Sequence, residues 1–69
     1  MDLSIVSFEI RKGEFVVDVD RGYISYGRIG ALTTERISHF FAWEDVPSVS
    51  MLRGWCESFL AELPKVIDA

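Results

Sequence analysis

His39 and Cys56 are the residues whose types could support nucleophilic catalysis. A cysteine–histidine pair needs a thiolate, a neighbouring base and access to solvent. Cys56 lies in the apolar stripe of a helical pattern, where a thiol behaves as a small inert hydrophobic side chain. His39 lies in a segment rich in strand-forming residues, and no third residue is placed to orient it. We therefore expect no catalytic residues and a protein that is not an enzyme.

Three carboxylates could gather on neighbouring strands, because Asp18 and Asp20 share one strand face and Glu9 lies on the preceding strand. Such a group could bind a divalent cation or act as an acid–base pair. There is no EF-hand spacing, however, and no histidine accompanies the carboxylates. A solvent-facing acidic sheet surface, paired with Arg28 or Lys12 across the strands, explains them as well. The sequence therefore predicts no metal site and no cofactor.

The segment Arg21-Gly22-Tyr23 is similar to the start of the aromatic strand in RNA-recognition motifs. The likeness ends there, because Ile24 and Ser25 stand where that motif has Gly or Ala and then Phe. Stacking of a single nucleic-acid strand on Tyr23 and Phe40 stays open as an alternative. The excess of acidic residues, 11 against 7 basic ones, gives a net charge of −4 and argues against binding to phosphate backbones or anionic membranes.

Length and composition predict a single domain, residues 1–69, near the lower limit for a chain that folds on its own core. Hydrophobic residues make up 49% of the chain, more than so small a core can cover. An exposed apolar patch usually binds a partner, most often a second copy. There is no cleavable signal pattern, and no run reaches the roughly 18 apolar residues of a membrane span. With a single cysteine, a cytoplasmic location fits best.

Alternating apolar and polar residues predict four strands, at about residues 3–10, 14–20, 23–28 and 36–43. Tight turns join the first three into an antiparallel meander. We place the fourth at RISHFFAW because β-branched and aromatic residues dominate that stretch. The preceding IGALTT is interpreted as a loop, with a short helix capped by Thr33 or Thr34 as the alternative.

One amphipathic helix is predicted at about residues 47–63. Its apolar residues recur at spacings of three and four: Val49, Leu52, Cys56, Phe59 and Leu63. Pro47 suits a first helical turn, Asp45 could cap the free amides, and Pro64 is expected to end the helix. The fold class is therefore α+β, with a four-stranded antiparallel meander and one C-terminal helix packed on one face.

Several apolar side chains remain after this packing is assigned. If the helix covers the face bearing Phe8, Val17 and Ile24, Tyr23 and Phe40 face the other side, where they could lie opposite each other in the third and fourth strands. Met51 and Trp55 extend the helix stripe beyond the width needed to pack on one sheet. The predicted interface comprises Tyr23, Phe40, Met51 and Trp55. The alternative is that these residues complete the core.

These features favour a small non-enzymatic protein-binding module that forms a homodimer and binds or inhibits a partner protein. Small inhibitors encoded by phages and other mobile elements share its size and charge. The alternative is a small nucleic-acid-binding or transcription-regulatory protein. In that case, basic residues would gather at a hairpin end of the dimer: Arg11, Lys12, Arg21 and Arg28.

Overall fold

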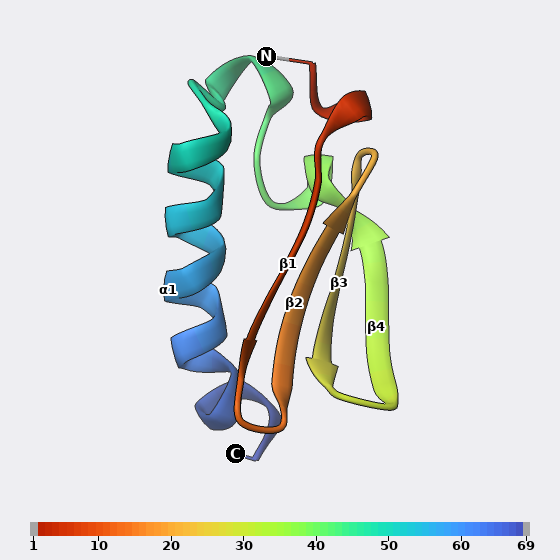
Figure 1. Cartoon of the computed structure of the whole chain (residues 1–69), viewed down its shortest axis with the longest axis vertical. Coiled ribbons are helices and arrows are strands. Elements are labelled where there is room, and N and C mark those ends of the chain that lie inside the picture. Colours follow the sequence, from red (N-terminus) through yellow and green to blue (C-terminus); the bar gives the residue numbers. More distant parts are fainter. Residues whose placement is uncertain (1, 69) are drawn as a thin grey trace.

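Four strands joined by two-residue turns form an antiparallel sheet, and a C-terminal helix packs on one of its faces (Figure 1). The computed structural model describes residues 2–68 and confirms the predicted α+β class. The sheet order is β1-β2-β3-β4. The elements are β1 (Ser7–Lys12), β2 (Phe15–Asp20), β3 (Tyr23–Arg28), β4 (Ala31–Arg36) and α1 (Val49–Ile67), with three 3-10 turns, η1 (Leu3–Ile5), η2 (Ile37–His39) and η3 (Trp43–Asp45).

The fourth strand lies at 31–36, so its prediction at 36–43 is wrong. Ile29 and Gly30 form a two-residue turn, with Gly30 at φ +93°, and the chain pairs again immediately after β3. The predicted loop is therefore mostly strand, and the β-branched Thr33 and Thr34 suit that role. The aromatic stretch after Arg36 leaves the sheet through η2 instead.

The first strand is also shorter than predicted. Residues 3–5 form η1, because the Asp2 carboxylate accepts a hydrogen bond from the backbone N–H of Ser4 at 2.9 Å and caps the turn. The strand begins only at Ser7, where pairing with Asp20 starts. Leu3, at the start of η1, is completely buried and closes one end of the core.

The core lies between α1 and one sheet face, as the alternation of β2 and β3 predicts. Its buried members come from every part of the chain: Leu3, Val6, Ile10, Phe15, Val17, Val19, Ile24, Ile37, Val46, Leu52, Cys56, Leu60 and Leu63. The helix covers the face that bears Phe8, Val17 and Ile24, as expected. Each fully buried aliphatic side chain contributes about 1.5–3 kcal/mol, so this single layer provides most of the driving force for folding.

Both ends of α1 differ from the sequence prediction. Ser48, not Asp45, caps the helix, and its hydroxyl accepts a hydrogen bond from the Met51 N–H at 3.2 Å. The helix continues through Pro64 to Ile67. Proline lacks a backbone donor, but its fixed φ is helical, so it removes one hydrogen bond without ending the helix. An ion pair from Arg28 to Asp68 holds this last turn against β3.

Candidate interaction surface

The strand β4 is the part of the sheet that α1 covers least. The helix packs on β1, β2 and β3, and β4 lies at the sheet edge farthest from it (Figure 1). Ala31, Leu32, Thr33 and Thr34 are all exposed. On the helix side, an open hollow of about 200 Å³ borders the strand, lined by Tyr26, Gly27, Arg28, Ala31, Thr33 and Ile67. The helix therefore leaves one edge strand accessible from both faces.

The two edge strands differ in charge. β1 carries Glu9, Arg11 and Lys12, and charges of this kind discourage another strand from pairing with an edge. The first four residues of β4, from Ala31 to Thr34, are uncharged, and two of them are β-branched. Because β4 has a strand neighbour on one side only, alternate backbone N–H and C=O groups along it face outward. It is the less protected edge.

An aromatic cluster fills the space between α1 and the β3–β4 side of the sheet. Its members are Tyr26, Phe40, Phe41, Trp55 and Phe59. The Tyr26 ring meets Phe59 at 5.0 Å and Phe40 at 5.9 Å between ring centroids, both edge to face. Phe41 lies 5.1 Å from Trp55. These geometries are favourable for aromatic pairs, so the cluster holds the segment after β4 against the helix.

Two of the four predicted interface residues, Phe40 and Trp55, belong to this cluster. Phe40 is 38% exposed, whereas Trp55 is partly buried and packs against the core. Met51 lies one turn before Trp55 on α1 and is 48% exposed. Met51 and Trp55 together form what we call the helix shoulder. Met51 is accessible there, and Trp55 also stabilises the fold.

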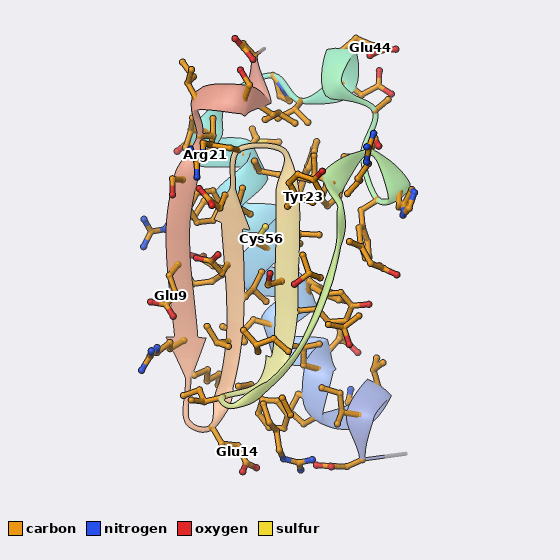
Figure 2. All side chains as sticks on the ribbon, turned by 90° about the vertical axis from the view of Figure 1, so that its right-hand side faces the viewer. Glu9, Glu14, Arg21, Tyr23, Glu44 and Cys56 are labelled. Atoms are coloured by element: carbon orange, nitrogen blue, oxygen red, sulfur yellow. The ribbon has the colours of Figure 1, made fainter. Side chains whose placement is uncertain are left out.

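Tyr23 lies elsewhere, so the expected pairing of Tyr23 with Phe40 is wrong. The residue opposite Tyr23 on β4 is Arg36, and Phe40 lies beyond the sheet after η2. Tyr23 is on the open face of the sheet, 47% exposed, whereas Phe40 contacts Tyr26 on the helix side. Figure 2 shows Tyr23 on the open face, near the β2–β3 turn. The error follows from predicting that the fourth strand begins at residue 36, five residues later than it does.

Sequence reasoning missed three contributors to this side of the molecule. Leu32 was assigned to a loop, but it is 45% exposed on the open face of β4. Ile67 was placed beyond the helix, but it ends α1 beside β4. The third, Phe41, links Phe40 to Trp55. The Ile29-Gly30 dipeptide was the available signal, because a Gly-containing two-residue turn directs the next residues into a hairpin.

The carboxylates of the open face do meet. Glu9 lies directly opposite Asp18, and Asp20 follows on the same face. Desolvation, with added repulsion from Glu9 and Asp20, raises the pKa of Asp18 above its ordinary value. Arg11 and Arg21 contact the outer two carboxylates, at 3.2 Å to Glu9 and 3.3 Å to Asp20. Among residues 2–68, no group of three potential ligands is placed to hold a metal ion.

Cys56 and His39 occupy different environments. Cys56 is completely buried in the stripe of α1, and burial, with a smaller contribution from Glu57, raises the pKa of its thiol to about 11. At neutral pH the group is a protonated, enclosed hydrophobic side chain. His39 is exposed at the end of η2. Cys56 thus has neither the thiolate nor the solvent access that nucleophilic chemistry requires.

The four basic residues of the nucleic-acid alternative are divided between the two ends of the sheet. Arg11, Lys12 and Arg28 lie toward the β1–β2 turn, and Arg21 lies at the β2–β3 turn. Arg28 pairs with both Glu14 and Asp68. Its charge is therefore largely compensated within the chain. Within one protomer, no single hairpin end carries all four.

Comparison with known proteins gives no relative from which a function could be transferred: no protein-family model, curated protein or solved structure matches this chain. Within residues 2–68, no helix has the length and apolar character needed to cross a membrane. The function is therefore inferred from the β4 edge and the helix shoulder.

Proposed function

We propose that this protein is a non-enzymatic protein-binding module that acts as a homodimer, with β4 of one copy pairing antiparallel with β4 of the other. The observation that carries the proposal is the one-sided β4 edge, uncharged from Ala31 to Thr34 and flanked by exposed apolar residues. Leu32 lies beside it on the open face, and Ile67 lies beside it on the helix side. A second copy would give this edge the strand neighbour that it lacks.

The backbone of β4 determines which residues would meet. The Ile37 N–H donates to the Gly22 carbonyl at 2.9 Å. By alternation, Thr33 and Glu35 also direct their backbone groups toward β3. Leu32, Thr34 and Arg36 then direct theirs outward, toward a second strand.

Charge restricts which residues of the two β4 strands can lie opposite each other. A two-fold axis at Thr34 places Leu32 opposite the Arg36 of the second copy and brings no like charges together. Axes at Glu35 or Arg36 would place identical charges directly opposite each other, which destabilises a strand pair. The Thr34 axis pairs residues 32–36 with one another, five of the six residues of the strand, and Thr34 is one of the residues whose backbone groups face outward. We therefore assign the dimer axis to Thr34.

The surface area of the molecule determines how large a share of it a dimer interface must cover. A standard interface covers about 800 Å² on each partner, about a fifth of the 4367 Å² surface of this chain. A single strand edge is too narrow for that area, so the apolar residues on both flanks must take part. In this arrangement both helices lie on the same face of a continuous sheet. The partner protein would bind between them, on Phe40, Met51 and Trp55, and would be inhibited if these residues cover its functional surface.

The substitution Thr34→Lys tests the dimer. It would place two ammonium groups opposite each other on the axis, while leaving the β3-facing backbone groups in place. The matched control is Ser7→Lys, on the exposed edge of β1 and on the same sheet face. We expect the wild type and Ser7→Lys to sediment as dimers at micromolar concentration, and Thr34→Lys to dissociate about tenfold or more readily.

Two results would contradict this dimer. One is a wild-type chain that sediments strictly as a monomer at micromolar concentration. The other is a Thr34→Lys variant whose dissociation constant equals that of Ser7→Lys. Circular dichroism of each variant checks that the fold is retained. A cytoplasmic location belongs to the same proposal, because a single buried thiol needs no oxidising compartment.

A further inference from the structure

A hollow on the surface lies at the β2–β3 turn end of the molecule, away from the helix shoulder. Its volume is about 310 Å³. The lining residues are Arg21, Gly22, Tyr23, Arg36 and Ser38. No carboxylate lines it, although the chain carries more acidic than basic residues. Its side chains supply two guanidinium groups, two hydroxyl groups and an aromatic ring, so the hollow is rich in hydrogen-bond donors.

Arg36 enters this hollow without a charged partner. Strand register places it directly opposite Tyr23. It takes part in none of the ion pairs found among residues 2–68, whereas every other arginine of the chain is paired. A guanidinium group without a carboxylate partner retains all five of its N–H donors for a ligand.

Arg21 approaches the same hollow from an unusual backbone conformation. Its φ is +44°, the one positive value among the non-glycine residues from 2 to 68. With Gly22 at φ +90°, both central residues of the turn have positive φ, an arrangement that favours Asn-Gly or Gly-Gly. An arginine is disfavoured here, so the needs of the turn do not account for it. A function of the Arg21 side chain would account for an arginine at this position.

The Arg21 side chain also remains available. It contacts the Asp20 carboxylate through Nε at 3.3 Å, and it is 77% exposed. The terminal nitrogens of the guanidinium group can therefore still reach a ligand. Tyr23 follows Arg21 by two residues and pairs with Arg36 across β3 and β4, and Figure 2 shows Arg21 and Tyr23 at the same end of the open face. Its ring offers an apolar surface beside two cations.

We propose that this hollow binds a phosphate monoester of an aromatic group. The guanidinium groups of Arg21 and Arg36 hold the phosphate oxygens, and the Tyr23 ring contacts the aromatic part. Two planar guanidinium groups match a doubly charged phosphate better than a singly charged carboxylate. The Ser38 hydroxyl adds a further donor. Arg36 also lies on the β4 edge of the proposed dimer, but Arg21 and Tyr23 do not, so substitutions at those two residues test the site separately from the dimer.

The test is a titration of the ¹⁵N-labelled full chain, followed by amide chemical shifts at constant ionic strength. The probes are phenyl phosphate, inorganic phosphate and phenylacetate. We expect phenyl phosphate to cause saturable shifts at residues 21–23, 36 and 38. We expect its binding to be tighter than that of inorganic phosphate, which lacks the ring, and tighter than that of phenylacetate, which carries one negative charge.

Substitutions connect the shifts to the proposed contacts. Arg36→Gln should weaken phenyl phosphate binding about tenfold or more, the loss expected for a charge-assisted contact. Arg21→Gly should weaken it comparably while relieving the positive φ, so this variant keeps the fold and isolates the side chain. Tyr23→Leu should bring phenyl phosphate down to the affinity of inorganic phosphate. Arg53→Gln, on α1 and paired with Glu57, is the control and should bind as the wild type does.

Three results would overturn the proposal. The first is the absence of saturable shifts with phenyl phosphate at millimolar concentration. The second is unchanged affinity in Arg21→Gly and Arg36→Gln, which would mean that the guanidinium groups do not hold the phosphate. The third is equal affinity for phenyl phosphate and inorganic phosphate in the wild type, which would remove the contact with Tyr23.

Discussion

Replacing Gly27 with alanine tests how closely β3 and β4 approach each other. Gly27 lies within β3 at φ +135°, and an added Cβ would lie 2.8 Å from the carbonyl oxygen of Ala31. The backbone conformation alone disfavours an L-residue by about 1–3 kcal/mol. The clash adds to this cost, because the obstructing atom belongs to the β4 backbone and cannot rotate away. We expect the free energy of unfolding to fall by about 2–4 kcal/mol.

Thermal unfolding followed by circular dichroism measures this loss. Unfolding entropy of about 2.1 cal/mol/K per residue means that each kcal/mol shifts the Tm of a 69-residue chain by about 7 °C. Gly27→Ala should therefore lower the Tm by about 14–28 °C. Such a loss is a large part of the total stability of so small a domain, about 3–10 kcal/mol.

Two other glycines provide matched controls. Gly30 also has a positive φ, but an added Cβ there meets nothing within 4 Å, so Gly30→Ala should cost about 1 kcal/mol from the backbone alone. Gly54 lies in α1 with open space around it, and Gly54→Ala should stabilise the protein by about 0.8–1 kcal/mol. If Gly27→Ala lowers the free energy of unfolding no more than Gly30→Ala does, β3 and β4 do not approach each other as closely as described.

Two further predictions concern the open face and the helix shoulder. Burial, with added repulsion from the neighbouring carboxylates, raises the pKa of Asp18, so its ionised form destabilises the fold at neutral pH. Asp18→Asn should therefore raise the Tm at neutral pH, and this gain should shrink as the pH falls and wild-type Asp18 binds its proton. A gain that persists unchanged in acid would show that charge is not its cause. On α1, Met51→Lys should change stability by less than about 0.5 kcal/mol but abolish capture of the partner protein, whereas Trp55→Ala should also lower the Tm. If folded Met51→Lys captured the partner protein as well as the wild type does, the helix shoulder would not be the binding surface.

The sequence predicted those elements in which a period and a turn agree. Strict alternation from Phe15 to Asp20, followed by the two-residue turn Arg21-Gly22, allowed one register, and the structure has it. In the helix, the spacing of Leu52, Cys56 and Leu63 identified three of the residues that are now fully buried. Local chemistry was sufficient here because burial and backbone preference favour the same arrangement.

The prediction failed where local preference and tertiary structure disagree. Residues 36–43 have strong strand propensity, but Ile37 is needed in the core at the sheet end, and Phe40 and Phe41 pack beside the helix. At Pro64, the loss of one hydrogen bond was weighed without the contacts beyond it, where Ile67 and Asp68 meet β3 and β4. Neither set of contacts can be predicted from the neighbouring residues in the sequence.

The candidate surfaces were predictable only in part for the same reason. The width of the apolar arc pointed to Met51 and Trp55, and both lie on the shoulder of α1. The β4 edge could not be found without the correct fourth strand. The hollow at Arg21 and Arg36 depends on the pairing of β3 with β4, which brings together residues 15 positions apart. An error in the predicted strand pairing therefore misplaces the strand and also hides any site whose residues that pairing brings together.

Simple dimensions explain why β4 remains uncovered. An α-helix with its side chains is about 10–12 Å wide, whereas four strands spaced about 4.8 Å apart span about 14 Å between the outer strand axes alone. One helix cannot cover such a sheet, so one edge of its inner face is left open. The chain after β4 returns through η2 and η3 to place α1 over β1, β2 and β3, which leaves β4 as that edge. Aromatic side chains from residues 40 and 41 fill only part of the remaining space. A domain with four strands and one helix therefore leaves one edge strand uncovered, here with Ile67 exposed beside it, and the proposed pairing of two such edges would cover that surface without any new element.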